Sequence, residues 1–456
     1  MLKKLSTKPI ILLVLLLSFT TANYAQTKKS KSASLSIDYT KLKQLAYGDS
    51  SRLVEIFKDI HLHPETAFTE TRTAAIVSKE LEGLGYTVIT GIGKTGVVGI
   101  LKNGEGPTVM YRADMDALPV KEATGLSYSS TVIAKNNDGT ETPVMHACGH
   151  DAHITWMLGV AKIMIALKNS WKGTLVFLAQ PAEEPITGAD AMVKDKLYER
   201  GVPLPDYLLG MHSKPFPVGV VENCAGVRMA GTDQFDITFH GVGGHGSVPH
   251  LAKDPVIMAA TAILDYQAIV NRSISVQSPH VITVGSIVAG AVNNIIPNSA
   301  VLKVNLRWFT EADRNAMING IKKVDSSIAF ANNLPAELYP TTFMKSMSYP
   351  VTNDTAMVNK INKAFGNFLT AGKLITDYPP VMASEDFPLL VVNSKKNPVY
   401  DFIFVGIANP ELYIAAVKEG KEFPFYYHTP YYTVDLGAIP FGTVIGTAAL
   451  VELFRE

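Results

Sequence analysis

Short apolar runs alternate with segments of helical periodicity along most of this chain. Between polar and turn-forming stretches, four runs have the length and composition of buried strands, at residues 97–101, 108–111, 174–179 and 207–211. Apolar residues recur every three or four positions over residues 71–84 and 154–167, which predicts helices. Strands and helices that alternate in this way predict a mostly parallel α/β sheet covered by helices on both faces.

The order of elements changes between residues 228 and 342. Strands are predicted at residues 234–239, 280–288 and 300–308, and helices at residues 255–270 and 312–330. This βαββαβ-like order predicts a small, ferredoxin-like α+β domain. Because candidate site residues occur both before and after it, we expect it to be inserted into one catalytic domain, built from residues 51–227 and 343–456.

The first 25 residues have the features of a secretory signal peptide. Three lysines precede an apolar run at residues 10–17, and small residues follow up to Ala25. The apolar run is too short to span a bilayer comfortably. We therefore expect a cleaved signal peptide, a lead-in at residues 26–50, a periplasmic or secreted enzyme, and no stable membrane insertion after cleavage. An uncleaved membrane anchor is the alternative.

Composition narrows the class of protein further. The chain has 456 residues, 47% of them hydrophobic and 18% charged, which is typical of a well-packed protein with more than one domain. Lys and Arg number 41, as do Asp and Glu, so no basic footprint for a nucleic acid is present and we expect no such partner. The two cysteines are Cys148 and Cys224. A bridge between them would remove Cys148 from the chemistry described next, so we expect both to be reduced.

Residues 146–153, with the sequence HACGHDAH, place three histidines, a cysteine and an aspartate within eight positions. Thiolate and imidazole ligands suit zinc or another borderline-soft divalent ion. The plainer alternative is a buried cysteine among structural histidines. Three further candidates strengthen the metal hypothesis: the pair Glu183 and Glu184 follows one predicted strand, His212 follows another, and His428 lies in an aromatic loop. In such a pair one glutamate can bind metal while the other serves as general base.

With these residues the sequence resembles the M20 metallopeptidase clan, most closely its amidohydrolase subfamily of N-acyl-amino-acid, hippurate and indole-acetyl-amino-acid hydrolases. The resemblance runs from about residue 53 to the end. Its motifs, in order, are HLHPE at 61–65, RADMDALP at 112–119, the cluster at 146–153, QPAEE at 180–184, MH at 211–212, GGHGS at 243–247, ASEDF at 383–387, and His428.

The resemblance implies two divalent metal ions in each subunit. The implied ligands are Cys148, His150, Glu184, His212 and His428, with Glu183 as the catalytic base. Asp116 would hydrogen-bond the outer nitrogen of a ligand histidine. Asp114 stands where many relatives in the clan have a metal-binding histidine. A thiolate favours zinc, whereas members of the subfamily often use manganese, and cobalt and nickel are further candidates.

In the resembling family the inserted domain is a lid and a dimerisation surface, so we expect a homodimer. His245 would reach the oxyanion that develops on the attacked carbonyl, in its own site or in that of the neighbouring subunit. Asn294 and Arg307 would hold the free carboxylate of the substrate. The plainer reading makes His245 and Asn294 turn residues and Arg307 a partner in a surface ion pair.

The sequence therefore predicts an exported amidohydrolase that cleaves the amide bond of N-acyl amino acids through a metal-bridged water activated by Glu183. A dipeptidase or carboxypeptidase of the same clan is one alternative. A non-catalytic binding protein on the same fold is another, although an intact Glu183 speaks against it. Residues 409–425, just before His428, either shape the substrate pocket or form a surface excursion.

Overall fold

The computed structural model describes residues 38–135, 139–392 and 394–455. The expected signal peptide and residues 26–37 of the expected lead-in lie outside the described residues. The rest of that lead-in contains helix α1 (Tyr39–Gly48), whose first turn is capped by the Asp38 carboxylate and whose Leu42 is buried. The folded part therefore begins before residue 51. Within the described ranges, no helix has both the length and the apolarity needed to cross a membrane.

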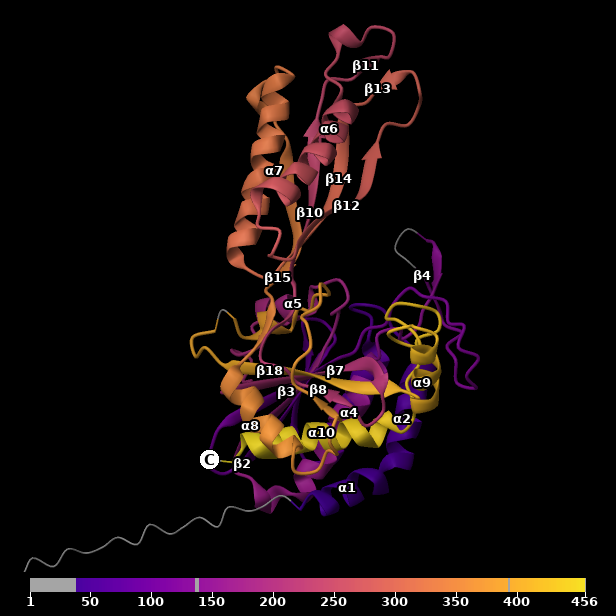
Figure 1. The fold of residues 1–456 in the computed structure, drawn as a ribbon, viewed down its shortest axis with the longest axis vertical. Coiled ribbons are helices and arrows are strands. Elements are labelled where there is room, and N and C mark those ends of the chain that lie inside the picture. Colours follow the sequence, from indigo (N-terminus) through magenta and orange to yellow (C-terminus); the bar gives the residue numbers. More distant parts are fainter. Residues whose placement is uncertain (1–37, 136–138, 393, 456) are drawn as a thin grey trace, which may run out of the picture. The chain divides into compact units, whose positions relative to one another are not determined.

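An eight-stranded, mostly parallel sheet forms the larger part of the fold (Figure 1). In spatial order its strands are β1 (Thr87–Ile92), β2 (Gly96–Asn103), β6 (Gly173–Gln180), β3 (Thr108–Asp114), β7 (Tyr207–Pro217), β18 (Val399–Ala408), β8 (Val221–Glu222) and β17 (Leu374–Ile375). Strands β6, β3, β7 and β18 pair in parallel, so their carboxyl ends lie at one edge of the sheet. The predicted fold class is confirmed, and the four predicted strands fall inside β2, β3, β6 and β7.

Helices cover this sheet and supply much of its hydrophobic core. They are α2 (Ser50–Leu62), α3 (Thr71–Gly83), α4 (His150–Ala166), α5 (Gly188–Lys194), α8 (Thr355–Phe365), α9 (Pro410–Lys418) and α10 (Ala438–Leu453). Helices α4 and α10 pack together and are buried along nearly their whole length. Helix α4 begins at His150, four residues earlier than predicted, which places two histidines in its first turn. Short two-stranded sheets complete this part: β4 (Ile133–Lys135) with β5 (Glu141–Pro143), and β9 (Gly226–Met229) with β16 (Val351–Asn353).

A second, antiparallel sheet has its own hydrophobic core. Its strands, in spatial order, are β12 (His280–Ala289), β14 (Ser299–Trp308), β10 (Gly231–His240) and β15 (Thr341–Ser348). Helices α6 (Pro255–Ala268) and α7 (Glu311–Ala331) pack against each other and against β14 (Figure 1). The chain order is βαββαβ, as the sequence pattern indicates. Strand β15 continues to Ser348, past the expected domain boundary at residue 342. The limits of the inserted domain, residues 228 and 342, stay predictions. A short pair, β11 (Gly244–His245) and β13 (Ile295–Ile296), extends from this sheet.

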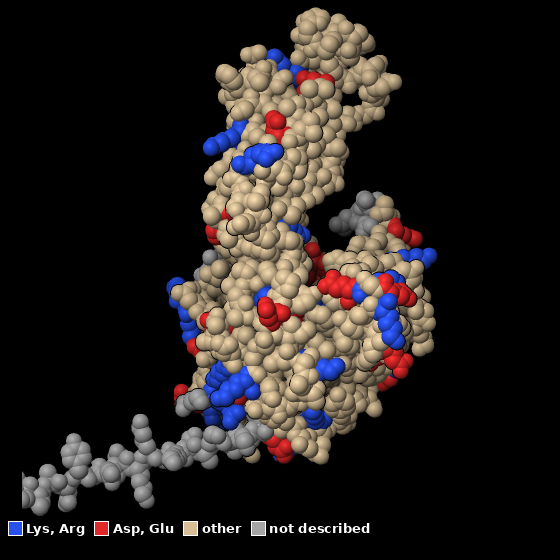
Figure 2. Space-filling model, in the orientation of Figure 1, with Lys and Arg blue, Asp and Glu red and all other residues tan. Residues whose placement is uncertain are grey.

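Charges of both signs lie on the face of the molecule drawn in Figure 2. The face drawn in Figure 2 carries lysine and arginine side chains in small groups, with aspartate and glutamate between them. This distribution agrees with the equal numbers of basic and acidic residues in the sequence.

Candidate metal centre

The turn before α4 aims two metal-binding side chains at one point. Cys148 precedes Gly149 in this turn, and His150 is the first residue of the helix. Gly149 has a φ of +83°, and a Cβ atom there would lie 2.6 Å from Ser213 Oγ and 2.8 Å from the Tyr432 hydroxyl oxygen. Only glycine tolerates both the left-handed backbone and this close approach. The sequence C-G-H therefore brings a thiol and an imidazole together.

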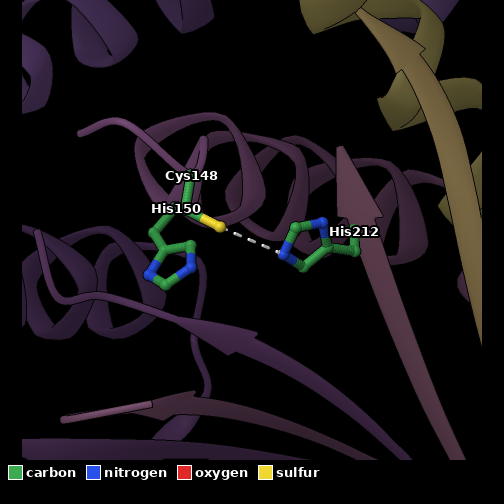
Figure 3. A group of neighbouring side chains, drawn as sticks. All are labelled: Cys148, His150 and His212. Atoms are coloured by element: carbon green, nitrogen blue, oxygen red, sulfur yellow. Dashed lines mark hydrogen bonds between the residues drawn. The ribbon is translucent and has the colours of Figure 1, made fainter. Parts of the chain in front are cut away.

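His212, in β7, places a second imidazole beside the thiol (Figure 3). The Sγ atom of Cys148 lies 3.6 Å from Nε2 of His212. Because Nδ1 of His212 donates to the Ser213 carbonyl oxygen at 2.7 Å, Nε2 keeps the lone pair that faces the sulfur. The ligand atoms of Cys148, His150 and His212 all lie within 4.8 Å of one another. Burial raises the pKa of the Cys148 thiol well above its usual value, and a bound cation would favour the thiolate instead.

A second group of donors shares the same sulfur. Cys148, Glu184 and His428 offer ligand atoms within 4.8 Å of one another, and His428 Nε2 lies 3.4 Å from a Glu184 carboxylate oxygen. The backbone of His428 has a φ of +59°, and its N–H donates to the Ala147 carbonyl at 2.9 Å. This contact ties the loop that carries His428 to the turn that carries Cys148. The structure thus gathers all five predicted ligands into two groups with Cys148 in common.

Buried polar atoms in these groups make no hydrogen bond. They include both ring nitrogens of His150 and one carboxylate oxygen of Glu184. Buried polar atoms are nearly always paired, and a divalent cation at this position would satisfy them. The donor set of one thiol, three imidazoles and a carboxylate fits a pair of such cations.

Two further donors nearby, Asp114 and His153, are already engaged within the protein. Asp114, His150 and His153 also lie within 4.8 Å of one another. However, Nδ1 of His153 contacts Asp114 Oδ1 at 2.6 Å, and Nε2 accepts the Ser213 N–H at 2.8 Å. His153 therefore joins β3, α4 and β7 and has no free lone pair. Burial alone would raise the pKa of Asp114, but His150 and Arg112 outweigh it and hold this pKa well below its usual value.

Asp116 positions the glutamate pair. Its two carboxylate oxygens accept the backbone N–H groups of Glu183 and Glu184 at 2.9 and 3.0 Å. Its distance to Nδ1 of His150 is 3.4 Å, longer than an ordinary hydrogen bond. The predicted contact with a ligand histidine is therefore loose, and the stronger contacts of Asp116 hold the backbone that carries both glutamates.

Glu183 opens onto a cavity of about 410 Å³. Its side chain is buried, and its pKa lies well above the usual value, first because of burial and then because Glu385 is nearby. The raised pKa means that Glu183 holds a proton more readily than an exposed glutamate does, which suits a general base. The cavity is also lined by Cys148, Glu184, Ile186, His212, Lys214, Met229, Gln234, Arg307, Tyr378, Val381, Ala383, Ser384, Glu385, Phe404, Glu422, Phe423, Tyr427 and His428.

A buried arginine beside this cavity was missed by the sequence analysis. Arg112 is 1% exposed and donates to Asp114 and Glu385, each at 2.7 Å, and to Gln180 at 2.9 Å. It ties β3 to the end of β6 and to the ASEDF motif. The signal was present in the sequence, because Arg112 and Asp114 are two residues apart on a strand and therefore share one face.

The three residues predicted to bind the substrate have different surroundings. Arg307 lines the cavity, where it donates to Asn305 and Ser384. Among the described residues, no carboxylate lies within ion-pair distance of its guanidinium. His245 lies in β11 and Asn294 just before β13, and both are exposed. Neither is among the described residues that line the cavity. In residues 409–425, Glu422 and Phe423 do line it, so this segment helps to shape the pocket.

Residues 110–420, more than half of the chain, match the family described as Peptidase family M20/M25/M40. The chain belongs to this family. This M20 protein is 38% identical to the hippurate hydrolase of Campylobacter jejuni over 336 residues, which cover 73% of this chain and 83% of that protein. It is 32% identical to thermostable carboxypeptidase 1 of Saccharolobus solfataricus over 410 residues, which cover 89% of this chain and 96% of that one.

A solved structure supports the same assignment. The YXEP protein of Bacillus subtilis, described as a dinuclear metal binding peptidase from the M20 family, matches this M20 protein with a TM-score of 0.69 at 26% identity. The match covers 90% of this chain and 99% of that one. The family read from the sequence motifs is confirmed, and the hydrolase relatives are consistent with its amidohydrolase subfamily.

Proposed function

We propose that this M20 protein hydrolyses the amide bond that joins an acyl group to an amino acid. One observation carries the proposal. Cys148 belongs to both donor groups, and it lines the same cavity as the buried Glu183. The similarity to a hippurate hydrolase supports this substrate class, since hippurate is an acylated glycine. An N-acyl amino acid is therefore the proposed small-molecule partner.

Cys148, His150, Glu184, His212 and His428 would hold two divalent cations. Zinc is the first candidate because one donor is a thiolate, followed by manganese, cobalt and nickel. When bound, such cations polarise a carbonyl group and make a water molecule more acidic.

Three side chains of the protein then have separate roles in the reaction. Glu183 accepts a proton from the water as its oxygen attacks the carbonyl carbon, and it returns a proton to the amine nitrogen as the C–N bond breaks. Asp116 holds the backbone of Glu183 in place. Arg307, which has no carboxylate partner among the described residues, binds the free carboxylate of the amino acid by a charge-assisted fork. The products are a carboxylic acid and a free amino acid.

The test is amine release from a panel of N-acetyl, N-benzoyl and long-chain N-acyl amino acids, with dipeptides alongside, using protein loaded with zinc or manganese. We expect the N-acyl set to be cleaved. Glu183→Gln should lower kcat by roughly 10²–10⁴-fold, the usual contribution of a general base, while metal content stays unchanged. Glu55→Gln, on the exposed side of α2, is the matched control.

A carboxypeptidase or dipeptidase is the second candidate, and the similarity to thermostable carboxypeptidase 1 favours it. Faster release from dipeptides than from N-acyl amino acids would establish this activity in place of the first. A metal-loaded protein that cleaves nothing in the panel would contradict both hydrolase proposals and leave the binding-protein alternative.

We further propose that the protein is exported to the periplasm or beyond and forms a homodimer. The charged and apolar pattern of residues 1–25 supports export. Strand β12 is an edge of the smaller sheet and exposes Ile287 and Val288, and α6 exposes Ile257 and Leu264, which supports a self-association surface there. The mass and the N-terminal residue of protein recovered from fractionated cells test export, because an intact N-terminus in the cytoplasm would contradict it.

A further inference from the structure

A buried lysine stands beside the proposed reaction centre on the same face of the sheet. Lys214 follows His212 by two residues in β7, so both side chains point to one face while Ser213 points to the other. Two residues along a strand correspond to about 6.6–6.8 Å. Lys214 also lines the cavity.

Aromatic side chains surround the Lys214 ammonium. Its nitrogen lies 3.8 Å from the centre of the Tyr378 ring, 4.9 Å from that of Phe216 and 5.0 Å from that of Phe404. Lys214 as a whole is 5% exposed. Ring faces attract a cation but accept no ordinary hydrogen bond from it. The rings therefore fix the position of the ammonium and leave it able to donate to another group.

The charges around Lys214 do not balance. Glu222 is its ion-pair partner, and the other oxygen of the same carboxylate accepts from Arg228 at 2.9 Å. The remaining hydrogen bonds of Arg228 go to backbone carbonyls, and its Nε has no partner. All three residues are at least 95% buried. Two positive charges thus share one negative charge, and a buried charge without a counterion is costly.

We propose that Lys214 recognises a carboxylate at the far end of the acyl group. This inference rests on the proposed function and extends it to a substrate class, amino acids acylated by a short dicarboxylic acid. The amino-acid carboxylate is already assigned to Arg307, which leaves Lys214 for the other end of the substrate. A ligand carboxylate at this position would balance the cluster of Lys214, Arg228 and Glu222. It would also accept the N–H groups that the aromatic rings leave unpaired.

The test compares N-succinylglycine with N-butyrylglycine, whose acyl chains have four carbons each and differ in the terminal carboxylate. With the metal-loaded enzyme we expect a higher kcat/KM for the succinyl substrate, by roughly 10- to 100-fold for a charge-assisted contact. Lys214→Met should remove this preference by lowering kcat/KM for the succinyl substrate more than for the butyryl substrate, whereas Lys214→Arg should keep the preference. The Met variant is expected to fold, because it leaves Glu222 and Arg228 as a one-to-one pair.

Lys345→Met is the matched control, since Lys345 pairs with Asp236 on the smaller sheet, away from the cavity lining. It should retain the succinyl preference. A wild-type enzyme without that preference would overturn the proposal. So would an equal loss on both substrates in Lys214→Met, because that result assigns Lys214 to the amino-acid carboxylate or to packing.

A binding measurement separates this inference from the proposed function. Calorimetry compares succinate with butyrate on the wild-type protein and on Lys214→Met. Tighter binding of succinate that disappears in the variant supports the carboxylate subsite even if no N-acyl amino acid is cleaved. Equal binding of both acids by the wild-type protein contradicts the subsite even if the enzyme is an active amidohydrolase.

Discussion

Position 149 accepts only glycine, for two reasons. Its φ is +83°, and a Cβ atom would overlap Ser213 and Tyr432. Gly85 provides a matched comparison, because its φ is +84° but nothing lies within 4 Å of the corresponding Cβ position. At Gly85 only the backbone strain matters, whereas at Gly149 the overlap adds to it and displaces the turn that aims Cys148 and His150.

We therefore expect Gly85→Ala to lower the free energy of unfolding by about 1 kcal/mol and to leave metal content unchanged. Gly149→Ala should cost about 2–4 kcal/mol, since overpacking adds to strain, and should reduce the amount of bound metal. Thermal unfolding and elemental analysis of the purified variants measure the two effects. Equal losses of stability, with full metal content in both, would show that the close approach at Gly149 does not position the ligands.

At the same scale, the contacts explain what the sequence could identify at the site. The sequence could single out candidate ligands because Cys148 and His150 are close in sequence, and Glu184 and His212 follow predicted apolar strands. Their binding of metal stays a prediction. Composition alone could not separate His150 from His153, since both are histidines in the first turn of one helix. They differ in their hydrogen bonds, and those of His153 depend on residues of β3 and β7 lying next to the start of the helix.

At the scale of elements, a buried carboxyl group sits between the two helices of the smaller sheet. Asp325, in α7, accepts a hydrogen bond from the Tyr266 hydroxyl in α6. Burial raises the pKa of Asp325 from 3.8 to about 6, more than the hydrogen bond lowers it. The folded state thus binds the proton more tightly than the unfolded state. Stability should therefore fall as the pH rises from about 4 to about 6, and stay reduced above that range.

Asp325→Asn should remove this loss, because an amide oxygen still accepts from Tyr266 and carries no charge. At pH 8 we expect the variant to be more stable by about 1–3 kcal/mol, since two pKa units correspond to roughly 3 kcal/mol. At pH 4 the two proteins should differ little. Chemical unfolding followed by circular dichroism at both pH values measures this difference. A gain of the same size at pH 4 would point to packing and not to ionisation.

Element boundaries were predicted less well than element types. The apolar runs that form β2, β3, β6 and β7 stand out in the sequence because both faces of these strands are buried. The start of α4 was missed because Gly149 begins the helix by its backbone geometry, without a capping side chain. Helix α9 was not predicted, because residues 409–425 were expected to form a loop whose role the sequence left open. Its Asn409 cap is a local signal, but the apolar residues of α9 are largely exposed and give no clear buried stripe.

For the whole molecule, the exposed position of His245 has a consequence for assembly. His245 is one of the residues assigned to the chemistry by the resemblance, yet it is exposed on β11 and does not line the cavity of its own chain. Its imidazole contacts Ser247 at 2.7 Å and makes no contact with the donor groups around Cys148. If His245 stabilises an oxyanion, we expect a second copy of the chain to supply it. The apolar edge formed by β12 and α6 is the candidate contact surface.

This arrangement predicts complementation between two inactive variants. His245→Ala and Glu183→Ala should each form inactive homodimers with normal unfolding profiles. A heterodimer of the two, purified through a different tag on each subunit, contains one site with Glu183 intact and His245 supplied by the other subunit. It should therefore show about half of the wild-type activity, because one of its two sites is complete. If His245 serves its own chain, both sites of the heterodimer lack an essential group and the heterodimer will be inactive. Sedimentation of the wild-type protein as a monomer at the assay concentration would contradict the prediction before any mixing. The site would then be complete within a single chain, without a residue from a second subunit.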